Sequence, residues 1–151
     1  MLVLAAAQAA GLDALAAAAF PDEACALLVG TVREQDGPGG GLVEVRRIVP
    51  AANVAADRRT GFEIDPATHI ALLRDLRERN AAERIVGHWH SHPNGRAEPS
   101  ATDAAMIHDP GLVWAISAVD AAGRPRGLRA FRPRPEGRFE DMTVAIRQEQ
   151  D

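Results

Sequence analysis

The chain has almost no cysteine, since Cys25 is the only one among 151 residues. One cysteine excludes an intrachain disulfide and a cysteine-rich zinc finger, and it favours a reducing, cytoplasmic setting. Any metal ion in this protein must therefore be held by histidine and carboxylate side chains.

An excess of positive charge is also missing. The 17 basic residues are all arginine, 21 acidic residues outnumber them, and the formal net charge is -4. Because a nucleic-acid-binding domain normally carries a clearly basic surface, nucleic acid is not an expected partner. A length of 151 residues with 46% hydrophobic content suits one ordinary domain, so we expect residues 1–151 to form a single domain.

No apolar run is long enough to cross a membrane. The opening stretch MLVLAAAQAAGLDALAAAAF is interrupted by Gln8 and Asp13, whereas a span needs roughly 20 apolar residues. It also lacks the positive region that begins a secretory signal, although such a signal remains the alternative interpretation. We expect a first strand or tether, then an amphipathic helix over residues 5–18, and no membrane partner.

Hydrophobic patterning predicts strands and helices in alternation. The expected strands are 25–32, 42–50, 84–92, 112–119, an edge-like strand at 126–133 and a final strand at 141–146, with a further short strand at 61–64. The expected helices after the first are 66–80, which begins with a proline, and 101–108. The stretch EQDGPGGG, residues 34–41, predicts a hairpin turn. This order predicts an α/β (mixed α+β) fold with a mixed sheet covered by helices.

Ligand-type side chains are concentrated in HWHSHPNGRAEPSATD, residues 88–103. Alternation along a strand puts His90 and His92 on the same face, where they form half of a metal site. After the Pro-Asn-Gly turn, Ser100 is a favoured N-cap for the next helix. Asp103 lies three residues later, so its carboxylate is close to the Ser100 hydroxyl around the first helical turn.

Two histidines and one aspartate at one point match a catalytic zinc site with three protein ligands and an open fourth position. Zinc lowers the pKa of its bound water to about 7, and hydrolysis also needs a base outside the ligand set. Glu23 is the best placed candidate, because a charged residue beside a strongly apolar strand has little structural purpose. Spacing alone does not select Glu23 from the ten glutamates.

These residues resemble a known family. The sequence HSHP at 90–93, followed after six residues by SATD at 100–103, resembles the motif of the JAMM metalloproteases. These are the catalytic MPN+ branch of the Mov34/MPN/JAB1 domain proteins. EACALLVG at 23–30 is similar to the family's segment around its glutamate, and GFEIDP at 61–66 is similar to the segment before its central helix. One departure is Cys25-Ala26, where the family often has Cys-Gly.

The resemblance implies a zinc-dependent peptidase or isopeptidase that cuts after the C-terminal glycine of a ubiquitin-like or sulfur-carrier protein. It implies one Zn²⁺ per chain, held by His90, His92 and Asp103. Glu23 would be the general base and proton shuttle, and Ser100 would help to stabilise the oxyanion. The implied fold is a curved mixed sheet flanked by helices, of the MPN/JAB1 deaminase-like type. The short length resembles the minimal prokaryotic members.

Two other functions remain open at this stage. A non-catalytic MPN scaffold or binding module would bind a partner through its surface and hold zinc weakly or not at all. A zinc deaminase would also use a metal-activated water, but its H-x-E and P-C-x-x-C motifs are missing from this sequence.

The remaining polar and aromatic residues have simpler interpretations. We expect His88, on the same strand face, to pack beside the metal ligands, and Trp89 to lie in the core on the opposite face. We expect Cys25 to be a small buried residue, and His69 and His108 to be on helix surfaces. A run of arginines on the 126–133 strand and its flanks is expected to be a solvated edge, with a cradle for an acidic partner as the alternative: Arg124, Arg126, Arg129, Arg132, Arg134 and Arg138.

Overall fold

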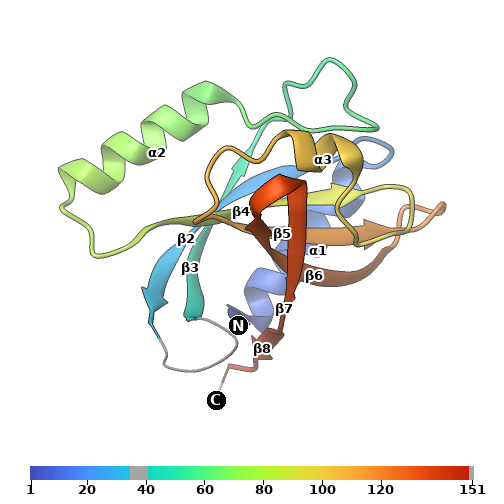
Figure 1. The fold of residues 1–151 in the computed structure, drawn as a ribbon. Coiled ribbons are helices and arrows are strands. Elements are labelled where there is room, and N and C mark those ends of the chain that lie inside the picture. Colours follow the sequence, from blue (N-terminus) through green and yellow to red (C-terminus); the bar gives the residue numbers. More distant parts are fainter. Residues whose placement is uncertain (35–40, 150–151) are drawn as a thin grey trace.

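The computed structural model of the chain describes residues 1–34 and 41–149. Its strands are β1 Leu2–Ala5, β2 Cys25–Arg33, β3 Leu42–Ala51, β4 Arg84–His92, β5 Val113–Val119, β6 Pro125–Arg134, β7 Arg138–Met142 and β8 Val144–Arg147. The α-helices are α1 Ala6–Ala19, α2 Pro66–Glu78 and α3 Ala101–Ala105, and a short 3-10 turn spans Pro135–Gly137. Figure 1 shows this arrangement.

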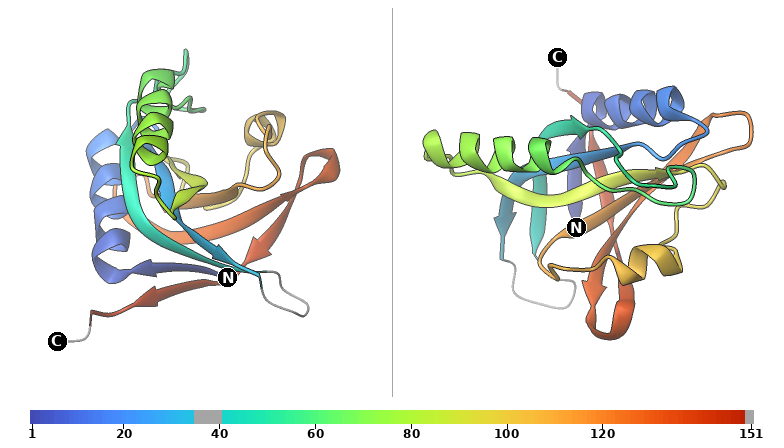
Figure 2. Two further views of the ribbon diagram at one scale, coloured as in Figure 1. Left: turned by 90° about the vertical axis from the view of Figure 1, so that its left-hand side faces the viewer. Right: turned by 90° about the horizontal axis from the view of Figure 1, so that it is seen from above.

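The strands form one mixed sheet in the order β7-β6-β5-β4-β2-β3-β1-β8. Strand β4 lies in its interior, antiparallel to β2 and parallel to β5. The sheet curves strongly, and helices flank both of its faces (Figure 2). The predicted fold class, a curved mixed sheet flanked by helices, is therefore confirmed.

Helix α1 covers one face of the sheet. Alanine is the strongest helix former, and the side chain of Gln8 accepts a hydrogen bond from the Ala5 backbone N–H at 2.9 Å at the start of the helix. Leu12 and Ala16 are buried against a core that includes Leu28 and Trp89. This packing confirms the expected first helix, although the helix is alanine-rich around most of its surface and only weakly amphipathic, and it places Trp89 in the core, as predicted.

Helix α2 packs on the opposite face of the sheet. Asp65 caps its N-terminus by accepting a hydrogen bond from Ala67 N–H at 3.0 Å, and Pro66 occupies the first turn. Leu72 and Leu76 pack against side chains of β2 such as Leu27. Residues 23, 25 and 27 alternate onto this face, so α2 covers the side of the sheet that carries Glu23.

Several predicted element boundaries are wrong. Residues 61–64 form no strand beyond an isolated bridge between Asn53 and Ile64. The helix predicted over 101–108 ends at Ala105, where the Met106 N–H bonds to the Asp103 carbonyl and tightens the last turn. The predicted turn at 34–41 lies mostly outside the described residues.

The C-terminal strands also differ from the prediction. The strand predicted as edge-like, β6, is internal because β5 and β7 pair with its two sides. The single strand predicted over 141–146 is two strands, because the chain changes partner at Thr143. β7 pairs with β6, whereas β8 runs parallel to β1 at the other edge of the sheet.

Among the described residues, no helix has the length and apolar character that crossing a membrane would require.

Candidate metal centre

The two motif histidines converge at the end of β4. His90 and His92 alternate onto the same face, as predicted, and their Nε2 atoms are 2.9 Å apart. Both side chains are buried, with exposures of 0% and 4%. Neighbouring strands on both sides of β4 hold the backbone that carries them.

Helix α3 brings Asp103 to the same point. Its carboxylate oxygens lie 3.3 Å from His90 Nε2 and 3.1 Å from His92 Nε2. A capping box fixes this turn: Ser100 N–H donates to Asp103 Oδ2 at 2.8 Å, and Asp103 N–H donates to Ser100 Oγ at 3.0 Å. The predicted grouping of His90, His92 and Asp103 is therefore present.

The three side chains have the geometry of a metal-binding set. Ligand atoms about 2.0–2.1 Å from a tetrahedral zinc ion are separated by roughly 3.3 Å, which is close to the distances of 2.9, 3.1 and 3.3 Å found here. His92 Nδ1 donates to the Arg96 carbonyl at 3.1 Å, which leaves the Nε2 lone pair of neutral His92 pointing at the cluster. A cation would satisfy these converging lone pairs.

Glu23 lies beside this cluster, two residues before β2. Its side chain is only 4% exposed, and its Oε1 has no hydrogen-bond partner among the described residues. Oε1 is 3.9 Å from His92 Nε2, and the ligand atoms of Glu23, His90 and His92 all lie within 4.8 Å of one another. Glu23 is therefore close enough to act on anything bound there, although Asp103 lies nearer to both histidines.

Burial and mutual charge determine the ionisation of this cluster. Burial raises the pKa of Glu23 to about 8. Burial also opposes ionisation of Asp103, but its contacts with the two histidines and with the Ser100 N–H together outweigh burial and hold the pKa of Asp103 well below its usual range. Burial lowers the pKa of His90. For His92 burial is the largest single influence, but the carboxylates of Asp103 and Glu23 and the Arg96 carbonyl together outweigh it and raise the pKa.

Ser100 lies at the rim of the cluster and is partly exposed. Its hydroxyl oxygen accepts from the Asp103 N–H, so the N-cap role that the sequence suggested is confirmed. The oxyanion role stays a prediction, since no substrate is present to test it.

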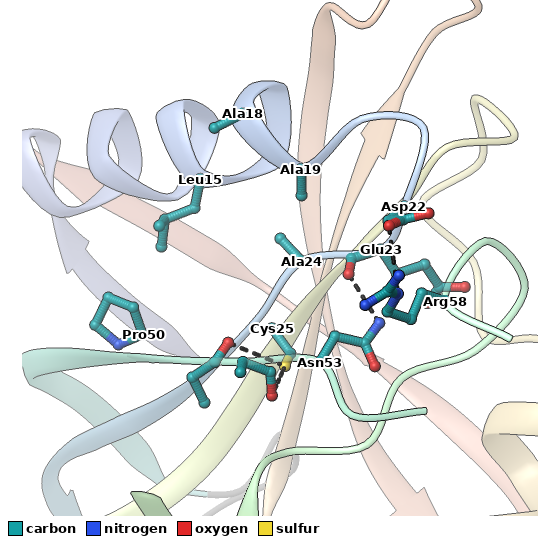
Figure 3. A pocket seen from close by; sticks show the side chains of 12 residues that line it. Leu15, Ala18, Ala19, Asp22, Glu23, Ala24, Cys25, Pro50, Asn53 and Arg58 are labelled. Atoms are coloured by element: carbon teal, nitrogen blue, oxygen red, sulfur yellow. Dashed lines mark hydrogen bonds and ion pairs between the residues drawn. The ribbon is translucent and has the colours of Figure 1, made fainter. Parts of the chain in front are cut away.

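Three polar or aromatic contacts around the cluster were missed by the sequence analysis. Ser91 accepts a hydrogen bond from Ala24 N–H at 2.8 Å, next to Glu23. The side chain of Asn53 donates to the Glu23 carbonyl at 2.9 Å (Figure 3). Phe62 stacks on His90, with ring centroids 4.1 Å apart. The only sequence signal for these contacts was the resemblance of GFEIDP to the family, which suggested no role for Phe62.

The secondary expectations can also be compared with the structure. His88 packs beside the ligands, 4.3 Å from Trp114 between ring centroids, and burial lowers its pKa to about 3. Cys25 is buried, and burial raises the pKa of its thiol to about 11. His69 is exposed on α2 as predicted, but His108 is exposed in the loop after α3 and not on a helix.

Much of the arginine run is paired with acidic residues. Arg126 bonds to Asp120, Arg134 to Glu140, and Arg129 to Asp141 and to Glu98. The arginine side chains in these pairs are exposed, which agrees with a solvated surface on β6 and β7. These acidic neighbours offset the positive charge that a cradle for an acidic partner would need.

Comparison with known proteins agrees with the motif. A desampylase from Haloferax volcanii is 33% identical over 97 residues, which cover 64% of each chain. A probable TtuB-protein conjugate cleaving protease from Thermus thermophilus is 30% identical over 97 residues, which cover 63% of this chain and 64% of the relative. The match thus spans about 64% of the length of these curated relatives.

Two solved structures match nearly the whole chain. A protein of Desulfitobacterium hafniense has a TM-score of 0.77 and 28% identity, covering 99% of this chain and 94% of its own. A protein of Salinibacter ruber has a TM-score of 0.66 and 27% identity, covering 97% and 92%. The model of the family described as prokaryotic homologs of the JAB domain matches residues 6–133. The chain therefore belongs to the prokaryotic JAB domain family, which confirms the resemblance to JAMM/MPN+ proteins.

Proposed function

We propose that this protein is a zinc-dependent peptidase or isopeptidase that hydrolyses the bond after the C-terminal glycine of a ubiquitin-like or sulfur-carrier protein. The observation that carries the proposal is the convergence of His90, His92 and Asp103 with the buried carboxylate of Glu23 beside them. A site built only for stability would not leave a buried carboxylate oxygen without a partner.

The names of two relatives support the substrate class. One is called a desampylase, and the other is called a probable cleaving protease for TtuB-protein conjugates. Both names describe an enzyme that removes an attached group, and the second name states that the group is cleaved from a protein conjugate. A protein conjugate as substrate agrees with the function that the motif implies.

In this proposal one zinc ion is held by His90, His92 and Asp103. Two imidazole nitrogens and a carboxylate oxygen are ligands that zinc accepts, and three protein ligands leave a position open for the reaction. A bound zinc ion would supply Lewis-acid chemistry, which activates water and polarises the scissile carbonyl. The His92 bond to the Arg96 carbonyl orients its imidazole for that role.

Glu23 acts as the general base and proton carrier. Its carboxylate accepts a proton from the attacking water and donates it to the leaving amine. Burial raises the pKa of Glu23, which makes its carboxylate a stronger base for the first transfer. Glu23 Oε1 is 3.9 Å from His92 Nε2, farther than the Asp103 carboxylate. Glu23 is therefore close enough to act on a bound water, while Asp103 is the carboxylate placed to bind the metal.

Ser100 stabilises the oxyanion that forms on the scissile carbonyl. The hydroxyl oxygen accepts from Asp103 N–H, and its own proton is available to donate. A donor placed for the oxyanion contributes about 3 kcal/mol to lowering the barrier.

We further propose that residues 1–151 act as a single domain and that the protein works in the cytoplasm. The single buried Cys25 supports a reducing compartment, because nothing in the chain depends on disulfide formation.

The proposal is tested with zinc-loaded protein and fusions in which a ubiquitin-like domain ending in Gly-Gly precedes a reporter. Cleavage after the glycine is expected and should stop when a chelator removes zinc. Glu23→Gln should lower turnover by roughly 10²-fold or more, in the range of general base catalysis, while zinc remains bound. Glu78→Gln, an exposed position on α2, is the control and should cleave normally.

Normal turnover by Glu23→Gln would show that the base is assigned wrongly. If wild-type protein binds zinc but cleaves none of the fusions, the substrate class is wrong. Absence of both zinc and cleavage would point to a scaffold.

A further inference from the structure

The segment 53–64, between β3 and α2, packs beside the metal centre without being a regular element. The side chain of Asn53 makes hydrogen bonds to the backbone of the segment at three points. The Asn53 Oδ1 accepts from Ala55 N–H at 3.0 Å and from Glu63 N–H at 3.1 Å, and its Nδ2 donates to the Gly61 carbonyl at 3.1 Å. The Val54 N–H also bonds to the Glu63 carbonyl at 2.9 Å. The side chain of Asn53 therefore joins the two ends of the segment through three hydrogen bonds and holds it as a loop.

The same segment holds the backbone of Glu23. Asn53 Nδ2 donates to the Glu23 carbonyl at 2.9 Å, and the Glu23 N–H donates to the Arg58 carbonyl at 2.6 Å. Figure 3 shows Asn53 and Arg58 close to Glu23, with Arg58 also paired to Asp22 at 3.5 Å. Both backbone hydrogen bonds of Glu23 are thus made to segment 53–64, because Glu23 precedes β2 and lies outside the sheet's ladder.

The segment also contacts a metal-ligand candidate through Phe62. The Phe62 ring is stacked on the His90 ring, with 4.1 Å between centroids and 18° between planes, and it is only 4% exposed. Trp114 presents its edge to the same histidine at 5.8 Å. His90 is therefore enclosed by aromatic rings.

His90 depends on this packing because it lacks the usual polar support. A metal-bound histidine normally donates its second ring N–H to a carbonyl or carboxylate, which fixes the ring. His92 has such a bond to Arg96, but His90 Nδ1 has no partner among the described residues. With no hydrogen bond at Nδ1 within the described part of the chain, the His90 ring is supported on that side only by the aromatic rings packed against it.

We propose that Asn53 and Phe62 are positioning residues, through which segment 53–64 fixes both the backbone of Glu23 and the imidazole of His90. One segment thereby fixes the position of the base, Glu23, relative to that of a metal ligand, His90. The Glu23 half of this inference rests on the proposed function, whereas the His90 half concerns metal binding alone.

The His90 half is tested by zinc affinity, measured by competition with a chromogenic chelator. Phe62→Leu should weaken zinc binding by roughly ten-fold or more, the loss typical when support of a ligand is removed. Phe131→Leu is the matched control, since Phe131 is equally buried at 4% in the same cluster and, among the described residues, packs edge to face with Phe139 and not on a histidine. It should lose similar thermal stability but keep wild-type affinity.

Phe62→Tyr keeps the ring and should restore zinc affinity. Phe62 lines a cavity of about 320 Å³, a volume far larger than the added hydroxyl. Equal zinc affinity in Phe62→Leu and wild type would overturn the role of Phe62. So would equal losses in Phe62→Leu and Phe131→Leu, because these would reflect general destabilisation.

The Glu23 half is tested by kinetics. Asn53→Ala should lower kcat and leave KM and zinc affinity unchanged. It removes a hydrogen bond to the Glu23 backbone but no contact with His90, His92 or Asp103. Asp65→Ala is the control: it removes the cap of α2 next to the segment and should leave kcat unchanged. Wild-type kcat in Asn53→Ala, or an equal loss in Asp65→Ala, would overturn the role of Asn53.

The two halves also separate this inference from the proposed function. If wild-type protein cleaves no fusion, the proposed function fails, while the zinc affinities still decide the role of Phe62. If cleavage occurs but neither variant behaves as expected, only the positioning inference is wrong.

Discussion

Single residues at the candidate metal centre are placed where stability alone would not put them. Glu23, His90, His92 and Asp103 are all buried, and burying ionisable groups is costly unless they are paired or bind a metal. The Asp103 carboxylate is paired with both histidines, but Glu23 Oε1 and His90 Nδ1 have no partners among the described residues. This cost is consistent with a site that is completed by a ligand.

Cys25 is also a buried ionisable residue, but its surroundings make it unreactive. The thiol donates weakly to the Ala51 and Ala52 carbonyls, and burial raises its pKa to about 11. We expect native protein to react with a thiol reagent far more slowly than protein unfolded in denaturant, as followed by absorbance. Equal rates in the two states would mean that Cys25 is accessible.

Residue types and spacing were enough to predict that His90, His92 and Asp103 meet and that Ser100 caps the next helix, but not which side chains pack around them. His90 and His92 are two residues apart on a strand, and Asp103 lies one helical turn after the Ser100 cap. Both spacings can be read from a short stretch of sequence. Asn53 and Phe62 are far from the motif along the chain and act through contacts that only the tertiary fold creates. No spacing rule connects them to it.

At the scale of elements, β4 and β5 must approach closely to hold the histidines. A Cβ added at Gly87 would lie 2.3 Å from the Val113 carbonyl oxygen. Gly87→Ala should therefore lower the free energy of unfolding by about 1–3 kcal/mol or more, as overpacking does, in a denaturant titration.

A glycine in open space provides the control. A Cβ at Gly11, in α1, would meet nothing within 4 Å. Gly11→Ala should raise the free energy of unfolding by about 0.5–1 kcal/mol, because alanine favours the helix. A loss of stability in Gly11→Ala, or none in Gly87→Ala, would contradict the packing described here.

Helix α3 is short, so its cap matters for both stability and chemistry. Ser100→Ala removes the capping hydroxyl and should cost about 1 kcal/mol in a denaturant titration of metal-free protein. Ser100→Gly should cost only about a few tenths of a kcal/mol at the cap, yet it has no side-chain donor and should lose turnover by about 10²-fold if the hydroxyl serves the oxyanion. Full turnover in Ser100→Gly would limit Ser100 to capping.

Element prediction succeeded where the pattern was local. The bounds of β4 agree with the predicted 84–92, because alternation and a Pro-Asn-Gly turn define them. It failed at residues 61–64, where the predicted short strand is only an isolated bridge between Asn53 and Ile64. It also failed at Thr143, where the chain leaves β6 to pair with β1, since such distant pairing leaves no sequence signal.

At the scale of the whole molecule, the metal centre joins parts of the chain that are distant in sequence. Glu23 precedes β2, the histidines are on β4, and Asp103 is on α3. A ligand that binds only the folded state stabilises it. Zinc at about 100 times its Kd should therefore raise the free energy of unfolding by about 2.7 kcal/mol, as measured by denaturant titration. An unchanged midpoint would mean that zinc does not bind the folded chain.

The central claim is that His90, His92 and Asp103 hold a zinc ion. Elemental analysis of protein purified without a chelator or a metal-binding tag tests it directly, beside a His92→Ala variant. The predicted result is about one zinc per wild-type chain, as for a site with three protein ligands, and loss of that zinc in the variant. Wild-type protein without zinc, even after the metal is offered, would contradict the claim.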